Sequence, residues 1–547
     1  MIERRYEQEE VDFVIVGAGA AGGVLAKELA EAGMSVVVLE AGPWRDPQHD
    51  FASDELSMKS LGWQETRLVS GSDPLTMGHN NSGYGVGGGT THFTGVFLRF
   101  HASDFMTRTV DGVGEDWPIR YEDLEPFYDR SEREIAVSGP KHFPWGEFHG
   151  PYPYPEREPL SPNAYLFKIG CEKLAIRTVT SPLAILSAPF EGRPPCINRG
   201  FCNQGCMPNS KFSTLIVHVP KAVRAGAEVL ADCMVTQVLM GADGRARGVA
   251  FRHEGREYEQ RAKIVILSAF VVENPRLLLN SANAQFPDGL ANSSGWVGRG
   301  IMVHSSHDVY GKFDEEVRLY KGTPVLASTQ ELYATDPKRG FARGYTLHAH
   351  GSRPLAIAQG ITRSQPLDLK PNVPQAGVGS GSPPVWGERL RHMMLDYNHY
   401  SRVTLVGETL PGADNRVTLA DEKDENGLPR AKVNYSYCDN DMKLIKHAVQ
   451  TMSSIIKAAG GTPEFVVPDT AHLMGGCRMG TDPSSSVTDS FGRTHDIPNL
   501  YICDASLFVT SSGCNPTNTV MALAYRTAAH LIDKAKKLEL QALQSRA

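Results

Sequence analysis

Hydrophobic patterns along the chain predict a sheet that is built partly from buried parallel strands. Residues Val11–Gly42 contain two continuous apolar runs around a Gly/Ala-rich turn and a helix-like stretch, as in a strand–helix–strand unit whose strands are buried on both faces. Residues Ala227–Ala269 alternate between apolar and polar positions, with turn pairs at Asp243-Gly244 and Glu254-Gly255, and predict a β-meander. The last apolar run, Ile264–Ala269, predicts a further parallel strand. An α/β fold is therefore expected.

Other segments predict helices and a linker. Residues Trp117–Val137 predict an amphipathic helical region that is entered through Pro118, and Thr519–Leu543 predicts a helix near the end of the chain. A Pro/Tyr-rich stretch, Pro144–Pro159, is typical of a linker that crosses between domains. The middle region, Tyr310–Tyr437, is interrupted by Gly and Pro and contains short β-like stretches such as SRVTLVGETL. These features predict more than one domain.

Composition narrows the class of protein and its partners. The chain has 547 residues, 41% hydrophobic and 21% charged, which is ordinary for a globular protein and leaves ample chain for a buried cofactor. The formal net charge is -7 and no long run of Lys or Arg occurs, so nucleic acid is not an expected partner. No apolar stretch is long enough to span a bilayer, so no membrane span is expected.

The N-terminus and the cysteines bear on the location of the protein. The first ten residues, MIERRYEQEE, are polar and acidic, and no signal-peptide core follows them. Nine cysteines in a chain of this length do not make a disulfide scaffold. These features predict a cytoplasmic protein, with a periplasmic location only if the chain is exported with a signal-bearing partner.

The turn after the first predicted strand carries a dinucleotide-binding pattern. The sequence Gly17-Ala18-Gly19-Ala20-Ala21-Gly22 follows a strand and opens a helix, and Glu40 ends the next strand about 20 residues further on. The glycines would let backbone N–H groups approach a pyrophosphate, and Glu40 would accept hydrogen bonds from the adenosine ribose. The alternative is a Gly-rich turn that only packs a helix on a sheet. The pattern itself does not separate NAD from FAD.

Three further blocks resemble the glucose-methanol-choline (GMC) family of FAD-dependent oxidoreductases. The first, GYGVGGGTTHFTG from Gly83 to Gly95, resembles the family's Gly-rich loop beside the flavin. The second, AKIVILSAFVVENPRLLLNS with the following GWVGRGIMVH, resembles its second flavin strand. The third begins HLMGGCRMG, runs from His472 to Ile532 and resembles the C-terminal signature. The chain departs from the family pattern at Phe270, where Gly is frequent, and in its loop at Tyr84 and His92.

The resemblance implies FAD, and not NAD, as the cofactor, and an α/β fold of two domains. The FAD-binding Rossmann-like domain is expected to be discontinuous, with residues 1–100, 215–309 and 470–547. A second, substrate domain built on an antiparallel sheet is expected from residues 101–214 and 310–469.

The resemblance also implies a catalytic pair. His472 stands at the position of the family's base, and Asn515, in SGCNPTNT, stands at that of its partner. A neutral imidazole can take a hydroxyl proton near neutral pH, and an amide beside it can orient the same oxygen. Asp504 is similar to the family acid near the FAD phosphates and ribityl chain, although a helix-capping role is the alternative. The residues expected to contact FAD are Gly17, Gly19, Ala20, Ala21, Gly22, Glu40, Gly87, Gly88, Gly89, Thr91, His92, Thr94, Val235, Ala269, Asp504, Ala505, Asn515 and Thr517.

The Gly-rich loop bears on how FAD is held. GGGTTHFTG closely resembles the corresponding loop of pyranose 2-oxidase, in which the histidine holds FAD covalently. The resemblance implies a bond between FAD and His92, and the alternative is a noncovalent histidine packed near the flavin ring.

Three cysteines, Cys196, Cys202 and Cys206, lie in one Gly/Asn-rich loop, PPCINRGFCNQGCMPNSK. Thiolates on such a loop can converge on one metal site, and large subunits of bacterial FAD-dependent glucose and fructose dehydrogenases have an iron–sulfur cluster in a comparable region. Their pattern includes adjacent cysteines, whereas Ile197 follows Cys196 here. Structural thiols or one disulfide are therefore preferred to a cluster, and zinc is disfavoured because the spacing has no CxxC pair. No metal site is expected.

Together the motifs predict an enzyme that oxidises an alcohol or sugar-type hydroxyl, with proton abstraction by His472 and hydride transfer to flavin N5. The resemblance to gluconate and glucose dehydrogenase large subunits implies a dehydrogenase that passes electrons to a quinone, a cytochrome or another acceptor. An electron-accepting or small companion subunit would be its partner. The alternatives are an oxygen-using oxidase of the same family and a flavin-containing lyase in which FAD is structural.

Overall fold

The structure is a computed structural model that describes residues 9–65, 67–75, 82–147, 149–157, 160–369 and 385–544, with side chains as far as residue 537. Parts of two predicted segments lie outside the described residues: 148 and 158–159 of the Pro/Tyr-rich linker and 370–384 of the middle region. Residues 1–8 of the polar N-terminus lie outside them as well.

The first of two large sheets has parallel strands at its centre. Its order is β7–β2–β1–β10–β9–β8, with β20 also paired to β10. The pairings β7–β2, β2–β1, β1–β10 and β10–β20 are parallel, and the apolar runs of β1 and β2 are almost fully buried, as predicted. The strands are β1 (Val11–Val16), β2 (Val36–Leu39), β7 (Glu228–Leu230), β8 (Met234–Met240), β9 (Ala246–His253), β10 (Arg256–Leu267) and β20 (Leu500–Ile502).

The predicted meander is confirmed with one correction. β8, β9 and β10 are antiparallel neighbours, and both turn pairs lie between them. The run Ile264–Ala269 is not a separate strand, because it belongs to β10 up to Leu267. The first half of β10 pairs antiparallel with β9 and the second half pairs parallel with β1, so one long strand joins the meander to the parallel sheet.

The second sheet is antiparallel throughout its described pairings. Its order is β18–β12–β15–β14–β13–β6, and β11 pairs with both β15 and β19. β11 and β19, which the predicted division assigns to the FAD-binding domain, are thus hydrogen-bonded into the second sheet, where the two sheets meet. The strands are β6 (Val179–Thr180), β11 (Met302–Ser305), β12 (Asp308–Lys312), β13 (Val325–Thr329), β14 (Tyr345–His350), β15 (Tyr400–Gly407), β18 (Thr462–Val467) and β19 (Thr470–Met474).

Two groups of helices pack on the sheets. α1 (Ala20–Glu31) packs against α6 (His218–Arg224) and α11 (Thr517–Gln544), and α11 packs against α4 (Tyr121–Ile135) beside the first sheet. α5 (Pro162–Lys173) and α10 (Asp439–Ala459) pack together and against strands of the second sheet. The remaining α-helices are α2 (Pro47–Asp50), α3 (Thr107–Asp111), α7 (Glu273–Asn280), α8 (Pro354–Thr362) and α9 (Gly387–Leu395). Small sheets are formed by β3 (Leu68–Ser70), β16 (Arg416–Lys423) and β17 (Pro429–Asn434), and by β4 (Ser138–Gly139) and β5 (Tyr154–Pro155).

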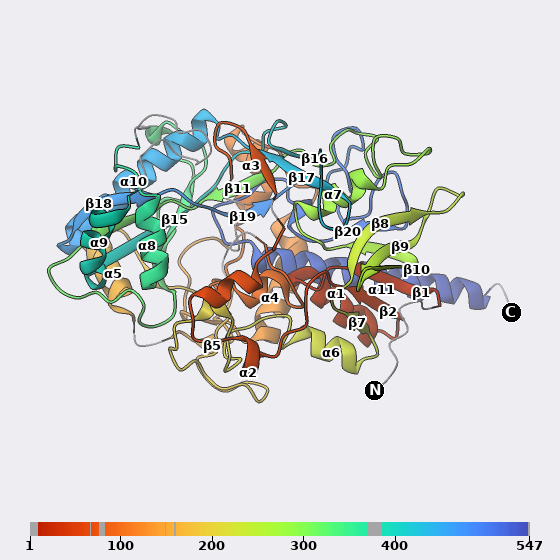
Figure 1. Cartoon of the computed structure of the whole chain (residues 1–547), viewed down its shortest axis with the longest axis horizontal. Coiled ribbons are helices and arrows are strands. Elements are labelled where there is room, and N and C mark those ends of the chain that lie inside the picture. The colour runs from red at the N-terminus through yellow and green to blue at the C-terminus, as the bar shows by residue number, and fades with distance from the viewer. Residues whose placement is uncertain are drawn as a thin grey trace.

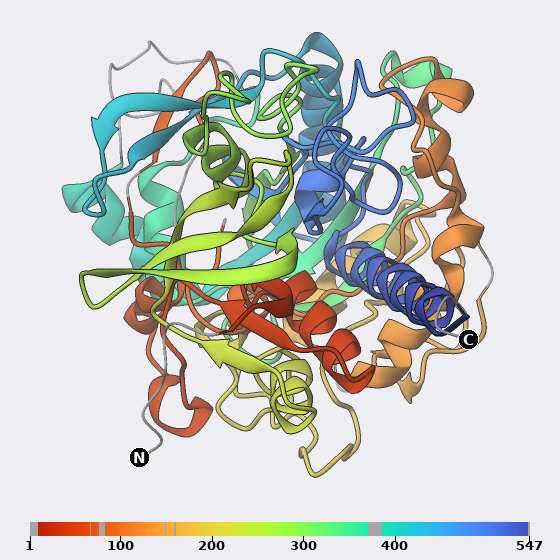
Figure 2. The same cartoon turned by 90° about the vertical axis from the view of Figure 1, so that its right-hand side faces the viewer.

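The two sheets and their helices lie side by side along the longest axis of the molecule. In Figure 1 the elements of the second sheet, with α5, α8, α9 and α10, gather at one end, and α1, α6 and the first sheet gather at the other. Figure 2 looks roughly along α11 (blue), which lies on one side of the red N-terminal elements, and the yellow-green β8–β10 meander extends on their other side. One cluster of buried apolar side chains runs through both halves in the described residues. No helix in the described part of the chain combines the length and the apolar character that crossing a bilayer requires.

Candidate active site

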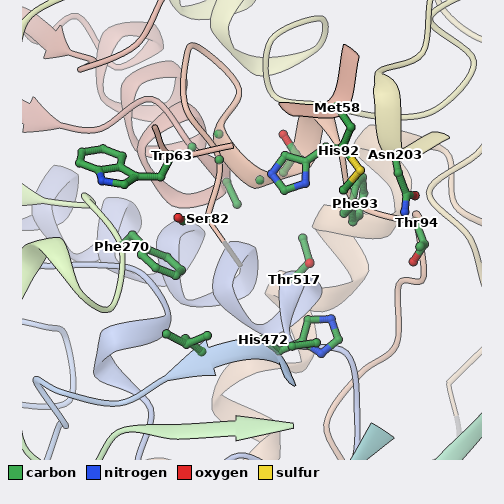
Figure 3. A pocket seen from close by; sticks show the side chains of 18 of the residues that line it. Met58, Trp63, Ser82, His92, Phe93, Thr94, Asn203, Phe270, His472 and Thr517 are labelled. Atoms are coloured by element: carbon green, nitrogen blue, oxygen red, sulfur yellow. The ribbon is translucent and has the colours of Figure 1, made fainter. Parts of the chain in front are cut away.

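One large cavity lies where the two sheets meet. Its volume is about 520 Å³, and its walls come from the ends of β1 and β2, the start of α1, and one face of β12, β14 and β15. In α/β folds, ligands bind at the carboxyl ends of the parallel strands, which is where this cavity begins. Figure 3 shows His92 and His472 on opposite sides of it, with Thr517 between them and with Trp63 and Phe270 toward one end.

The turn after β1 fits a pyrophosphate. Gly19 and Ala20 lie at the N-terminus of α1, where the first backbone N–H groups have no partner inside the helix. A Cβ added to Gly19 would meet no atom closer than Gly88 Cα at 3.9 Å, so this glycine faces open cavity. Gly22 acts differently, because its Cβ would lie 1.9 Å from the carbonyl oxygen of Gly17. Gly22 therefore lets the helix pack on the turn.

Glu40 follows β2 and lines the same end of the cavity. Its Oε1 accepts hydrogen bonds from the backbone N–H groups of Gly42 (3.0 Å) and Gly85 (3.1 Å), and Oε2 accepts one from Ala18 (2.8 Å). Burial raises the pKa of Glu40, and the three N–H groups oppose this shift. Because a carboxylate oxygen can accept two hydrogen bonds, Oε2 has room for one more donor. This capacity fits a ribose hydroxyl.

The Gly-rich loop is held from behind by a buried lysine. Lys211 Nζ donates to the carbonyl oxygens of Thr90, Thr91 and Phe93, each at 3.0 Å. Burial lowers the pKa of Lys211 to about 8. One ammonium group therefore fixes the backbone on both sides of His92, whose side chain is 6% exposed and lines the cavity.

Asp504 caps a short helix and also lines the cavity, so the capping role and the predicted place beside FAD are compatible in one residue. Its carboxylate accepts hydrogen bonds from Ser506 N (2.8 Å), at the start of a 3₁₀ turn, and from Phe270 N (2.8 Å). Phe270 has φ 88°, in the left-handed region that favours glycine, and its ring lines the cavity. The backbone conformation explains why Gly is frequent here in the family that the sequence resembles. Phe270 adds a side chain at the cost of backbone strain.

His472 is presented to the cavity by an irregular strand. Along β11 and β19, Met302 pairs with Met474 and His304 with Ala471, so three steps on β19 face two on β11. Such a bulge redirects side chains locally. His472 lies inside it with φ 54°, a conformation that non-glycine residues seldom adopt outside functional or strained sites.

A chain of hydrogen bonds fixes which nitrogen of His472 carries the proton. His304 Nε2 lies 3.1 Å from the carbonyl oxygen of Ser511 and 2.8 Å from that of Ser512. Carbonyl oxygens only accept, so His304 Nε2 carries a hydrogen. Burial lowers the pKa of His304 to about 4, so its Nδ1 is bare at neutral pH and accepts from His472 Nδ1 at 2.8 Å. The lone pair of His472 is therefore on Nε2.

A second histidine orients the amide beside that lone pair. Asn515 Nδ2 lies 3.4 Å from His472 Nε2, and Asn515 Oδ1 lies 3.1 Å from His348 Nε2. Burial lowers the pKa of His348 to about 4, so the neutral ring donates from Nε2 to the amide oxygen. The NH₂ group of Asn515 then faces His472. Burial also lowers the pKa of His472 well below its usual range, which keeps it in the neutral, proton-accepting form.

Buried histidines make the fold acid-sensitive. Burial lowers the pKa of His304, His307 and His348 to about 4 and that of His218 to about 3. A histidine in the unfolded chain titrates near pH 6.5, so the unfolded chain binds more protons than the folded chain between about pH 6.5 and pH 4. The stabilisation is complete above about pH 6.5 and is lost as the pH falls.

Two buried carboxyls act in the opposite direction. Burial raises the pKa of Glu408 to about 7 and that of Asp441 to about 6, so the folded chain holds these protons where the unfolded chain has lost them. Burial also lowers the pKa of His350 and His472 and raises that of Glu40, Asp469 and Asp504. Because the shifted histidines outnumber the shifted carboxyls, stability should fall as the pH falls below about 6.5. We expect urea midpoints, measured with FAD at one fixed excess, to fall between about pH 6.5 and 5. A midpoint that stays constant over this range would contradict the assignment.

Most of the residues expected from sequence to contact FAD do line the cavity. They are Gly17, Gly19, Ala20, Ala21, Glu40, Gly88, Gly89, His92, Thr94, Val235, Ala269, Asp504, Ala505, Asn515 and Thr517, with His472 beside them. Gly22, Gly87 and Thr91 do not line it and instead shape its walls: a Cβ on Gly87 would lie 2.6 Å from Thr91 Cγ2, and Thr91 Oγ1 donates to the carbonyl of Gly88.

Sequence reasoning missed the two histidines that orient the pair. His304 lies in the block GWVGRGIMVH, which was matched as a flavin segment without a role for its histidine. His348 lies in GYTLHAH, where histidines alternate two apart, as on one face of a strand. This alternation was the available signal. The partners of both histidines lie far away in sequence, and no local pattern reveals them.

The three cysteines of the predicted loop lie around one small cavity of about 20 Å³. All three are free thiols. The backbone N–H of Asn198 lies 3.4 Å from Cys196 Sγ, and that of Lys211 lies 3.2 Å from Cys206 Sγ. Burial raises the pKa of Cys202 to about 12, so it is a protonated thiol. Among the described residues, no group of three or more His, Cys, Asp or Glu is arranged to hold a metal ion.

Comparisons with known proteins agree with this geometry. The models of the N-terminal and C-terminal parts of GMC oxidoreductases match residues 11–306 and 411–524. The chain is 32% identical to 2-methyl-1,2-propanediol dehydrogenase of Mycolicibacterium austroafricanum, over 96% of this chain and 95% of that protein. It is 29% identical to the fructose dehydrogenase large subunit of Gluconobacter japonicus, over 97% and 99%. A solved structure of formate oxidase from Aspergillus oryzae, in a study of FAD modification, shares the fold, with a TM-score of 0.69, 15% identity and coverage of 97% and 100%.

These matches span nearly the whole chain and include both the N-terminal and the C-terminal part of GMC oxidoreductases. The protein belongs to the GMC oxidoreductase family, whose members are FAD-dependent enzymes that oxidise alcohol and sugar donors.

Proposed function

We propose that His472 is the base that removes the hydroxyl proton of the substrate and that Asn515 orients the same oxygen. The observation that carries this proposal is the hydrogen-bond chain from the Ser511 and Ser512 carbonyls through His304 to His472. It leaves the lone pair of His472 on Nε2, next to the Asn515 NH₂ group in the cavity. A base and a donor at one point are what the oxygen of an alcohol needs as it loses its proton.

FAD, when bound along the cavity, supplies the hydride acceptor. Gly17, Gly19 and Ala20 would hold its pyrophosphate, Glu40 its ribose, and the loop around His92 its ring. The protein's own steps are then local. His472 Nε2 takes the proton, and its Nδ1–H remains bonded to His304, so the charged ring keeps its orientation. Asn515 donates to the substrate oxygen while His348 holds the amide oxygen in place.

We further propose a dehydrogenase that passes electrons to a quinone, a cytochrome or another acceptor, working with an electron-accepting or small companion subunit. Support comes from two relatives that are named as dehydrogenases, one of them as a large subunit. A cytoplasmic location is also proposed, supported by nine cysteines with no disulfide among them. Cell fractionation tests the location.

Anaerobic bleaching of the flavin tests the reaction class. Purified holoenzyme mixed with a panel of alcohols, polyols and sugars should lose its flavin absorbance with at least one of them, and the same panel with oxygen present separates a dehydrogenase from an oxidase. A flavin that no alcohol bleaches would contradict the proposal and would favour the alternative function, a flavin-containing lyase. The covalent bond to His92 stays a prediction, and acid precipitation tests it, because covalently held flavin remains in the pellet.

The role of His304 gives a separate prediction. His304→Leu removes the acceptor for His472 Nδ1, so both tautomers of His472 become populated and the imidazole loses its fixed orientation. We expect the limiting rate constant of flavin reduction to fall by about 100-fold, while the substrate Kd stays within about twofold. Stopped-flow reduction over a range of substrate concentrations separates the two constants.

His307→Leu is the matched control. His307 is also buried and lies three residues from His304. In the described part of the chain it makes no hydrogen bond to His472 and does not line the cavity. Equal losses of reduction rate in both variants would mean that general damage to the strand, and not the tautomer, causes the effect.

A further inference from the structure

The face of the second sheet that lines the cavity carries two rows of polar side chains. Thr404 pairs with Asp308 on one side and with His348 on the other, so these three residues form the first row. His348 is bonded to Asn515, which in turn contacts His472. The first row therefore borders the catalytic pair.

The second row lies two residues further along the same strands. It consists of Tyr310, Arg402 and His350, and Tyr310 pairs with Arg402 in the register of β12 and β15. Side chains two residues apart on a strand lie on the same face, about 6.7 Å apart along the strand. A substrate whose reacting hydroxyl lies at His472 can therefore reach the second row only through a part of the molecule away from the reacting carbon.

Hydrogen bonds connect the first row to the second. Arg402 Nη2 lies 2.6 Å from Asp308 Oδ2, and Asp308 also accepts from the Thr404 hydroxyl. Arg402 Nε is buried and has no hydrogen-bond partner among the described residues. His350 donates from Nδ1 to the carbonyl of Gly351 at 2.7 Å, and because burial keeps its pKa low, its Nε2 is an acceptor.

These groups favour one class of substrate. Burying an ion pair has a large desolvation cost, and an apolar ligand would cover its donors and acceptors without replacing their bonds to water. Hydroxyl groups both donate and accept, so they match such a mixed surface. Charged side chains of both signs line the cavity, among them Arg402 paired with Asp308, and Arg363 beside Asp469. The surface therefore does not select a charged ligand.

We propose that Asp308, Arg402 and His350 form a distal subsite for the non-reacting hydroxyls of a neutral, polyhydroxylated substrate, either a polyol or a sugar. The inference rests on the proposed function of the His472–Asn515 pair, which receives the reacting hydroxyl. It makes simple alkanols poor substrates, because a site built to bond hydroxyls rejects an analogue that lacks them.

The test compares substrates of equal carbon number on the holoenzyme. We expect sorbitol or glucose to reduce the flavin with a kcat/KM at least about 100-fold above that of hexan-1-ol. Arg402→Met and His350→Phe should each lower the ratio of these constants by about 10- to 100-fold, the scale of a lost charged or paired hydrogen bond. Arg247→Met is the control, because this arginine pairs with Glu259 at the surface, outside the cavity wall, and its replacement should leave the ratio unchanged. FAD absorbance and Tm of each variant verify the fold, and if Arg402→Met does not fold, His350→Phe carries the test.

The outcomes separate this inference from the function on which it depends. An unchanged ratio in both variants, a wild-type preference for hexan-1-ol, or a preference for gluconate over glucose would overturn the neutral polyol subsite, while flavin reduction itself would stand. If neither polyols nor alkanols reduce the flavin, the proposed function fails first. Flavin spectral shifts on adding sorbitol to His472→Ala give a binding readout that does not need turnover.

Discussion

Replacing His472 by alanine is expected to slow flavin reduction by ~10²–10⁴-fold, the usual scale for a lost general base, with FAD retained. Without the imidazole, no other neutral nitrogen has its lone pair beside the Asn515 NH₂ group in the described cavity, because His348 Nε2 is bonded to the amide oxygen. The measurement is single-turnover reduction under anaerobic conditions, followed at the flavin absorbance maximum.

His307→Ala is the control for this variant, since it removes a histidine of similar burial that does not line the cavity. Added imidazole should restore part of the rate in His472→Ala and none in the control. Near-normal reduction by His472→Ala would remove this residue from the role of base.

The largest expected loss of stability follows from Arg343→Leu. Arg343 is 2% exposed and binds three carboxylates: Glu408 through Nε (2.9 Å), Asp111 through Nη1 (2.7 Å) and Asp104 through Nη2. Without the guanidinium these carboxylates remain buried and repel one another, and breaking a buried ion pair from one side costs about 3–5 kcal/mol. We expect at least that loss in the free energy of unfolding, measured by urea denaturation at neutral pH.

The Arg343→Leu substitution should also disturb the active site, and its effect on stability should depend on pH. Tyr333 donates to Asp104 (2.6 Å) and accepts from the backbone N–H of Gly513 (3.2 Å), so the cluster supports the loop that carries Asn515. Burial raises the pKa of Glu408 to about 7, so this carboxyl takes up a proton at lower pH, and the difference between wild type and variant should shrink. Arg247→Leu is the control, because its pair with Glu259 is exposed at the surface and is worth no more than about 1 kcal/mol. Similar losses of unfolding free energy in the two variants would show that Arg343 does not stabilise the buried carboxylates as expected.

Local pattern was sufficient for the elements that bind the dinucleotide. Val11–Val16 and Val36–Leu39 are strands because their apolar runs leave no polar face, and Gly22 is required because its Cβ would collide with the turn. Helix ends were less exact. α4 begins at Tyr121, where Asp123 accepts from the Arg120 N–H, and not at the expected Pro118. A capping bond fixes the end of a helix more closely than hydrophobic spacing does.

Only those residues of the candidate site that lie in a recognisable sequence motif could be predicted. His472 and Asn515 stand in recognisable blocks, whereas His304 and His348 matter through contacts with residues more than 160 positions away. Such contacts depend on the pairing of β11 with β19 and on the position of β14 beside the C-terminal loop. Short polar strands do not specify that pairing by pattern, because the register depends on the assembled sheet.

The irregular pairing of β19 has a consequence for how the site can change over time. Because the bulge around His472 comes from one extra residue against β11, the length of the segment from Thr470 to Met474 decides where the imidazole lies in the cavity wall. A single deletion there would restore regular alternation and would move the residue at this position away from His304 and Asn515. Substitutions keep this alignment of the strand, whereas insertions and deletions change it. Grafting the base onto another scaffold would therefore require the bulged strand and its partner together.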